Sequence, residues 1–413
     1  MRSSDCKLHL ASPSVSRTST ALENLRGIVI LLVIGFHTML AYVMWMPAGE
    51  AGFDQPPFSW RAFPIVDAHR FFGFDLFCAW QDVFLMSLLF FLSGLFVWPS
   101  LQRKKGWAFL RDRMLRLGLP YMFGIAVIIP LALYPAYSVR AADPSVTEYW
   151  HALLALPFWP NGPLWFVWQL LALNLVACAL YAAVPHAIPW LGRWSATAGE
   201  KPLCYFGAVL TLSALAYAPL AVVYTPWAWT DIGPFTVQIC RPLLYAVYFF
   251  AGVGVGAAGI ERGLLAADGI LARRWASLLT LALLTLFVWM GLTALTVNGG
   301  ASLRVTIVAA LSFVPASAAG CFFLIAVCLR FVAAPSRLLG RLGRNAYALY
   351  LVHYVFVVWL QFVLLPLMLP AAIKAPLVFV GSLCLSLVIA VAARSLPFAA
   401  RLIGSQGRML ATS

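Results

Sequence analysis

Arg26 and His37 are the only polar side chains in an otherwise apolar run, Leu25 to His37, with the sequence LRGIVILLVIGFH. A guanidinium group binds anions, and an imidazole takes up and releases protons near neutral pH. In a helix, eleven positions separate the two side chains by roughly 16 Å along the axis but only about 20° around it. We therefore predict that both face one side of a helix, Arg26 at a membrane surface and His37 about halfway across.

The sequence around His37 allows two interpretations. A titratable group at that depth is costly to hold in lipid, so it should face a cavity or the bundle interior, where it can take part in a reaction. Alternatively, the imidazole only hydrogen-bonds to a neighbouring helix and joins the two. The segment alone leaves both interpretations open.

The composition decides the class of protein. Of 413 residues, 63% are hydrophobic and only 10% are charged, which excludes a soluble domain. Because about 20 apolar residues span a bilayer, we predict an all-α, polytopic integral membrane helical bundle. About ten spans are expected, near 25–45, 80–98, 117–138, 163–184, 204–224, 240–258, 276–297, 304–329, 345–365 and 375–397. We expect one membrane domain, 21–400, between a disordered cytoplasmic tail, 1–20, and a cytoplasmic C-terminal tail, 401–413.

The distribution of charge predicts the orientation. The connections 99–116 and 330–344 are rich in Arg and Lys, whereas the connections on the other side carry mostly Asp and Glu. The positive-inside rule then places both termini in the cytoplasm and the acidic loops outside the cell inner (plasma) membrane. Topology and contact with anionic lipid account for the net charge of +14, so no nucleic-acid partner is expected.

Several common chemical motifs are missing from the sequence. The eight cysteines include no CxxC pair and no Cys/His spacing suited to zinc, so we expect no metal site. A phosphate-binding loop and a GxSxG elbow are also absent, which disfavours nucleotide hydrolysis and soluble-type serine hydrolase chemistry. The run GVGVGAAG at 252–259 is typical of a helix face that packs closely on another helix.

Two connections raise a functional question. The predicted outer loop 46–79 places Asp67, His69, Arg70 and Asp75 among many aromatic residues, which suits either a carbohydrate-facing surface or an interfacial aromatic belt. The predicted inner segment 107–120, WAFLRDRMLRLGLP, carries Arg113 and Arg116 about one turn apart. It suits either an anchor for lipid headgroups or a phosphate-binding site.

Several segments together resemble the membrane acyltransferase 3 family. The arginine, ten residues and histidine of Arg26 to His37 resemble its first-span signature. Four more segments follow in the family's order: FFLSGLFVWPSLQRK at 90–104, FLRDRMLRLGLP at 109–120, GPLWFVWQLL at 162–171 and RNAYALYLVHYVFV at 344–357. The resemblance covers nearly the whole chain.

Some positions depart from the family pattern. Many relatives carry Arg and Pro before the Phe-Phe-x-x-Ser-Gly element, where this chain has Leu85 and Ser87. Many also have a histidine before Leu-Trp, where Pro163 stands. These differences concern the acceptor and the acyl group rather than the class of reaction. No esterase-like domain is expected after the tenth span, so we expect a stand-alone membrane acyltransferase.

The resemblance implies an acyltransferase that moves an acyl group, acetyl or similar, from cytoplasmic acyl-CoA to a hydroxyl of a glycan or other acceptor outside. Acyl-CoA would be a co-substrate, with no permanently bound cofactor. Arg26, Arg113 and Arg116 would bind the anionic part of the donor. His37 would act as general base on the attacking hydroxyl, so no serine or cysteine nucleophile is required.

Further residues receive roles from the same resemblance. Tyr350 and His353, both expected to be catalytic with His37, are three residues apart and so share a helix face, and His353 lies at a depth similar to that of His37. His353 would orient His37 or polarise the thioester carbonyl, or else serve only the packing of the helices. Trp165 and Asp82 are assigned to the substrate, with an interfacial belt as the alternative for Trp165.

Two other classes of protein stay open. A multi-span transporter of an acylated or sugar substrate would also hold polar residues at mid-membrane, although the sequence shows no inverted repeat. A structural or regulatory membrane protein would account for the helices, but not for the alignment of Arg26 with His37.

Overall fold

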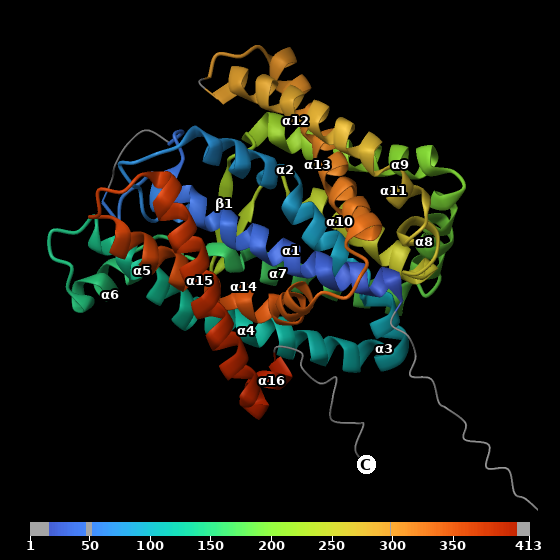
Figure 1. Ribbon diagram of the computed structural model, residues 1–413, viewed down its shortest axis with the longest axis horizontal. Helices are drawn as coiled ribbons and strands as arrows, with labels where there is room; N and C mark the ends of the chain where they lie inside the picture. The colour runs from blue at the N-terminus through green and yellow to red at the C-terminus, as the bar shows by residue number, and fades with distance from the viewer. Residues whose placement is uncertain (1–15, 47–51, 298, 403–413) are drawn as a thin grey trace, which may run out of the picture.

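The computed structural model describes residues 16–46, 52–297 and 299–402. Helices dominate this part of the chain, with one short pair of strands (Figure 1). In chain order the elements are α1 (Arg17–Met39), α2 (Phe72–Gly94), α3 (Val97–Arg113), α4 (Leu119–Phe123), α5 (Ile129–Ser138), α6 (Val146–Leu154), α7 (Trp165–Ala183), α8 (Ala187–Ala196), α9 (Pro202–Tyr224), β1 (Trp229–Ile232), β2 (Phe235–Gln238), α10 (Pro242–Ala258), α11 (Ile270–Arg273), α12 (Trp275–Val297), α13 (Leu303–Phe331), α14 (Arg337–Leu364), α15 (Ala371–Ser395) and α16 (Pro397–Leu402).

The predicted membrane bundle is confirmed. Nine helical stretches within the described ranges are long and apolar enough to cross a membrane, and a tenth is added if α10 and the bent segment Gly263–Arg273 form one span. The bend between these two pieces is 90°. Each of the ten predicted spans falls on one of these stretches. A helix bundle follows from the chemistry, because backbone N–H and C=O groups in lipid must pair within the segment.

Helix α1 runs through the middle of the bundle and packs mainly on α14, with further contacts to α13, α15 and α2 (Figure 1). Two glycines let α1 and α14 approach closely. A Cβ on Gly27 would lie 2.5 Å from the carbonyl oxygen of Leu339, and one on Gly343 would lie 2.3 Å from that of Glu23. Small residues of this kind are the usual means of close helix packing in membranes.

The glycine run at 252–259 has the predicted packing role. Gly252 and Gly256 on α10 face α2, where an added Cβ would lie 2.1 Å from the carbonyl oxygens of Phe91 and Leu95 respectively. The backbones of α2 and α10 are therefore in direct contact at these two glycines.

The predicted start of the second span is wrong by eight residues, because α2 begins at Phe72 rather than near residue 80. Of the two acidic residues in α2, Asp75 lies in the missed stretch 72–79 and Asp82 lies inside the predicted span, and both are compensated. Asp75 accepts hydrogen bonds from the backbone N–H groups of Met44 and Trp45, both at 2.8 Å. Asp82 forms an ion pair with Arg241.

The chain start also differs from expectation, since α1 begins at Arg17 within the segment expected to be disordered. Ser16 caps it by accepting a hydrogen bond from the N–H of Ser19 at 3.1 Å. Such a serine is a favoured N-cap. Residues 1–15 and 403–413, which make up most of the two expected tails, lie outside the described residues.

The basic connection 99–116 is helical rather than a loop. Helix α3 covers it, with a kink at Lys105, whose φ is +61°. The chain then continues through a π-helical turn, Met114–Gly118, into α4, a second π-helical turn, Gly124–Ile128, and α5. Lys and Arg are good helix formers and extend their charged ends to the membrane surface. Arg116 therefore lies on a π-helical turn, a feature common at functional sites.

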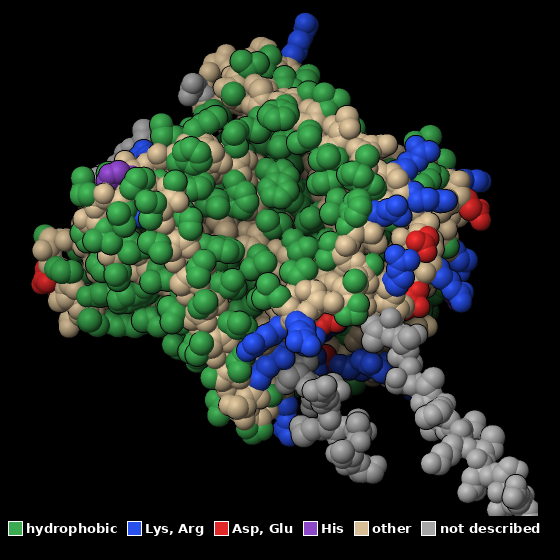
Figure 2. Space-filling model, in the orientation of Figure 1, with side chains coloured by type: hydrophobic (Ala, Val, Ile, Leu, Met, Phe, Trp, Pro, Cys, Tyr) green, Lys and Arg blue, Asp and Glu red, His purple; other side chains and the backbone are tan. Residues whose placement is uncertain are grey.

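Charge separates the two ends of the bundle. Figure 2 shows Lys and Arg side chains gathered around the end where α1 begins, whereas apolar side chains cover most of the remaining visible surface.

At the other end, the described part of the loop that follows α1 is held by two ion pairs. Arg61 pairs with Asp231 of β1 at 2.8 Å, and the buried Asp67 pairs with Lys374 of α15 at 2.6 Å. Asp67 and Asp75 thus serve internal contacts.

Candidate active site

A cavity of about 940 Å³ opens between α1, α2, α7 and α14, at the end of the bundle that carries the basic residues. Five arginines line its wide part: Arg26, Arg113, Arg116, Arg344 and Arg394. Apolar side chains, among them Val33 and Phe166, line its deeper part together with Tyr350. The sequence predicted the first three arginines as one anion site, and the structure brings them to one cavity.

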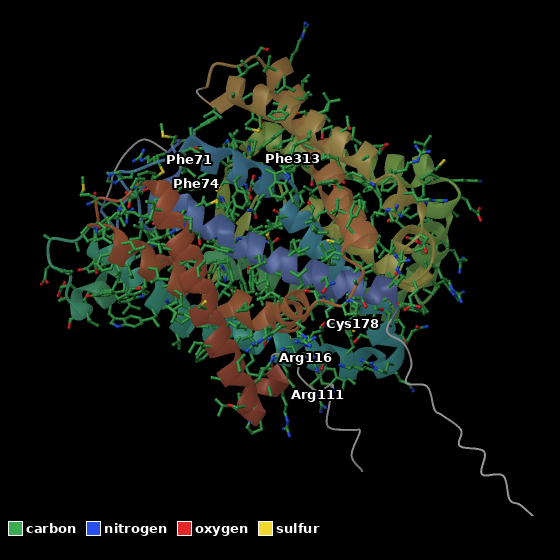
Figure 3. All side chains as sticks on the ribbon, viewed as in Figure 1. Phe71, Phe74, Arg111, Arg116, Cys178 and Phe313 are labelled. Carbon is green, nitrogen blue, oxygen red and sulfur yellow. The ribbon has the colours of Figure 1, made fainter. Side chains whose placement is uncertain are left out.

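The arginines differ in how far their charge is compensated. Arg116 pairs with Asp112 at 3.0 Å, and Arg344 pairs with Glu23 at 2.8 Å. Arg26, Arg113 and Arg394 form no ion pair with any carboxylate of the described residues. Figure 3 shows Arg116 and Arg111 at the same end of the molecule, opposite to Phe71 and Phe74. The cavity therefore holds an excess of positive charge suited to an anion with several negative groups.

Aromatic rings fix the two uncompensated arginines closest to α3. The guanidinium carbon of Arg26 lies 4.3 Å from the ring centre of Phe96, and that of Arg113 lies 4.8 Å from the ring centre of Phe109. A planar guanidinium stacked in this way keeps its N–H groups available for an oxyanion. The arrangement thus orients the arginines without using up their charge.

His37 lies one helical turn beyond the deep end of the cavity. Val33 on α1 and Tyr350 on α14 line that end, and the histidines follow four and three residues later. The ring centres of His37 and His353 are 5.2 Å apart, and Tyr354 approaches His37 edge-on at 5.3 Å. The expectation that the two histidines lie at similar depth is confirmed.

The hydrogen bonds of the pair define which nitrogen is free. Nδ1 of His353 lies 2.8 Å from the carbonyl oxygen of Tyr350, so it carries the proton and donates it. Nε2 of His353 and Nδ1 of His37 are both buried and have no hydrogen-bond partner among the described residues. Buried polar atoms without a partner are rare in native proteins and indicate a place where a ligand, water or proton is accommodated.

A loop at the start of α7 reaches the same region from the other side. The hydroxyl of Tyr350 donates to the carbonyl oxygen of Pro163. The amide of Asn161 donates to the carbonyl oxygen of Pro234, in the turn between β1 and β2, at 3.4 Å. Pro234 lines a second cavity of about 430 Å³, together with Phe158, Trp159 and Asp231. The loop 161–163 therefore contacts one lining residue of each cavity, Tyr350 and Pro234.

Trp165 and Asp82 line neither of the two cavities and contact residues at the start of α10. The ring of Trp165 stacks on Tyr245 of α10 at 5.9 Å and meets Trp229 of β1 edge-on at 5.8 Å. Both carboxylate oxygens of Asp82 accept from Arg241, at 3.1 and 2.5 Å. The guanidinium of Arg241 also lies over the ring of Phe313, labelled in Figure 3. Asp82 thus serves first to balance a buried arginine.

Two residues of this region were missed by the sequence analysis. Arg394, at the end of α15, lines the arginine-rich cavity, and Gln361 on α14 contacts the backbone of His37. A basic residue at a helix end and an amide inside an apolar helix are weak signals by themselves. Only the packing of α14 and α15 on α1 brings them to the site.

Comparison with known proteins bears on the whole chain. A family model described as an acyltransferase domain matches residues 19–394, from the first turn of α1 to the end of α15. No curated protein and no solved structure gives a significant match. The match covers the five arginines of the first cavity, the histidine pair and all the lining residues of the second cavity. The chain therefore belongs to the acyltransferase 3 family of multi-pass membrane acyltransferases.

Proposed function

We propose that the protein transfers an acyl group, acetyl or similar, from acyl-CoA in the cytoplasm to a hydroxyl of a glycan or related acceptor outside the cell membrane. The observation that carries this proposal is the histidine pair at the deep end of an arginine-lined cavity. An anion site and a proton acceptor one helical turn beyond the cavity suit a donor with phosphates at one end and a thioester at the other.

The arginines would bind the phosphate groups of the donor at the basic, cytoplasmic end. Arg26, Arg113 and Arg394 carry charge that no described carboxylate balances, which supports an anionic ligand. The acyl thioester then extends along Val33 and Phe166 toward Tyr350. These apolar walls exclude water, which protects the thioester from hydrolysis before the acceptor arrives.

His37 would be the general base. It takes the proton from the acceptor hydroxyl as the oxygen attacks the thioester carbonyl, and the C–S bond then breaks. The proton returns to the leaving sulfur, so the products are an acyl ester and free CoA thiol. The Nδ1 proton of His353 is donated to a backbone carbonyl, which leaves the buried Nε2 as an acceptor without a partner among the described residues. This arrangement suits a partner that orients His37 and stabilises its protonated form.

The acceptor would approach from the opposite end. The second cavity combines the aromatic rings of Phe158 and Trp159 with the carboxylate of Asp231, and such a lining suits a hydroxyl-rich ligand. The loop 161–163 joins this cavity to Tyr350 by two hydrogen bonds. Trp165, on the next turn of the chain, would shape the end of this route.

The test uses radiolabelled acetyl-CoA and cell envelopes from a strain that lacks the protein, which supply the acceptor whatever its identity. The purified protein in lipid nanodiscs should move the label into an alkali-labile ester. His37→Gln should lower the rate by about 10²–10⁴, the usual contribution of a positioned base. His353→Gln should keep more activity than His37→Gln.

The competing interpretations give different results. If His37 only joins helices, its loss costs about 0.6 kcal/mol of packing and His37→Gln stays active at normal abundance. If the protein is a transporter, the thioester stays intact and no free CoA thiol appears. Either result would contradict the proposal.

A further inference from the structure

The contact between α1 and α14 next to the histidine pair holds several buried polar atoms. Four of them have no hydrogen-bond partner among the described residues: His37 Nδ1, Thr38 Oγ1, His353 Nε2 and Gln361 Oε1. Unpaired polar atoms are costly in a membrane interior, so this contact is not optimised for packing alone. The association of the two helices leaves some of its polar groups without a partner among the described residues.

Gln361 contacts His37 through the backbone. Its side chain is only 2% exposed, and its amide nitrogen lies 3.0 Å from the carbonyl oxygens of both His37 and Thr38. The two N–H groups of one amide are enough for both bonds. These carbonyls belong to the last turn of α1, where carbonyl groups lose their partners within the helix. Gln361 therefore caps α1 at the residue that bears the imidazole.

Helix α14 thus contacts both the ring and the backbone of His37. His353 lies against the imidazole ring, with a centre-to-centre distance of 5.2 Å, and Gln361 holds the backbone carbonyl of the same residue. Contacts from α14 therefore fix both the backbone and the ring of His37. A displacement of about 1 Å in a reacting group can cost about 10²-fold in rate.

We propose that Gln361 is a positioning residue that fixes the imidazole of His37 in the orientation needed for proton transfer. This inference rests on the proposed function, because it assigns Gln361 a role only if His37 is the base. Gln361 acts through the backbone of His37 and contacts neither the donor site nor its arginines. Its loss therefore lowers the rate of transfer and leaves the affinity for the donor unchanged.

The first variant is Gln361→Met, which keeps the length of the side chain and removes both hydrogen bonds. In the envelope assay, the rate at saturating acetyl-CoA should fall by about 10²-fold, while the KM for acetyl-CoA stays the same. Gln361→Asn, whose amide is one methylene too short to reach both carbonyls, should give the same split. Because Gln361→Asn keeps a polar group at this position, it replaces Gln361→Met in the test if the methionine variant does not fold.

The matched control is Asn24→Leu. Asn24 is 1% exposed, and its amide also donates to two backbone carbonyls, those of Val332 and Ala334, at 2.8 and 2.9 Å. It lies toward the other end of α1, about twenty Å from His37 by helical rise. Its loss should lower the unfolding temperature, yet the rate per folded molecule should change by no more than about twofold.

A double-mutant cycle separates positioning from a general structural role. In a His37→Gln background, Gln361→Met should cause no further loss, because the group that it positions is gone. An equal loss in both backgrounds, or a rate for Gln361→Met within about twofold of the wild type, would overturn the assignment. An active His37→Gln protein would instead contradict the proposed function, so the two failures are distinguishable.

Discussion

At the scale of single residues, the hydrogen bonds around His37 bear on its two interpretations. A histidine that only joins helices should bond to the neighbouring helix through its imidazole. Here the link between α1 and α14 runs from Gln361 to backbone carbonyls, and Nδ1 of His37 has no partner among the described residues. The imidazole is thus free for another partner, which favours the catalytic interpretation.

The spacing of Arg26 and His37 was readable from the sequence because both lie on one helix with a fixed geometry. Their partners were not readable, because these come from helices far along the chain. Gln361 lies 324 residues after His37 in the sequence, yet its side-chain amide donates a hydrogen bond to the backbone carbonyl of His37. No local pattern predicts such a contact.

Arg394 gives a prediction for the donor site. It lines the cavity, and its Nε is buried without a partner among the described residues. One charge-assisted hydrogen bond contributes about 1.5–3 kcal/mol, so Arg394→Gln should raise the KM for acetyl-CoA by about 10- to 100-fold. The rate at saturating donor should change little. Steady-state kinetics over a range of acetyl-CoA concentrations measures both values.

The control for this variant is Arg337→Gln, which removes the same charge from an exposed position at the start of α14 that does not line the cavity. Its KM should stay near the wild-type value. If both variants raised the KM equally, a general electrostatic attraction would explain the effect, and a direct contact of Arg394 with the donor would be ruled out.

At the scale of elements, the position of Arg26 depends on the close contact between α1 and α14. Gly27, the next residue, lies against the backbone of Leu339, so a methyl group there meets a carbonyl oxygen at 2.5 Å. Backbone atoms cannot move aside as a flexible side chain can. The two helices must separate, and overpacking of this kind costs about 1–3 kcal/mol.

Gly27→Ala should therefore lower the unfolding temperature in nanodiscs and weaken binding of acetyl-CoA, because Arg26 moves with its helix. The matched control is Gly207→Ala on α9, where an added Cβ meets nothing within 4 Å. Alanine there favours the helix by up to about 1 kcal/mol. Equal unfolding temperatures for the two variants would show that the contact at Gly27 does not limit stability.

At the scale of the whole molecule, hydropathy predicted the helices well and their ends less well. Apolar stretches of sufficient length must cross the bilayer as helices, so all ten predicted spans have a helical counterpart. The start of the second span was misplaced at Asp75, whose carboxylate accepts hydrogen bonds from the backbone N–H groups of Met44 and Trp45. Other acidic residues are paired with remote partners. Asp82 pairs with Arg241 across 159 residues, and Asp67 pairs with Lys374 across 307. A residue-by-residue hydropathy count cannot include such pairs.

The orientation of the bundle in the membrane is the remaining prediction. Under the proposed function the arginine-lined cavity faces the cytoplasm, where acyl-CoA is made, which agrees with the positive-inside rule for the connections 99–116 and 330–344. Two exposed positions report on opposite ends: Gln102 on α3 and Thr147 on α6. Each is changed to cysteine in a background without the eight native cysteines.

An impermeant maleimide should label Thr147→Cys in intact cells and Gln102→Cys only after the membrane is opened. The expected difference is large, because the two positions lie on opposite sides of a barrier that the reagent does not cross. A permeant maleimide should label both and controls for accessibility. Labelling of Gln102→Cys but not of Thr147→Cys in intact cells would show that the topology is the reverse of the predicted one. The arginine-lined cavity would then face away from the cytoplasmic pool of acyl-CoA, and the donor would have to be a different anion.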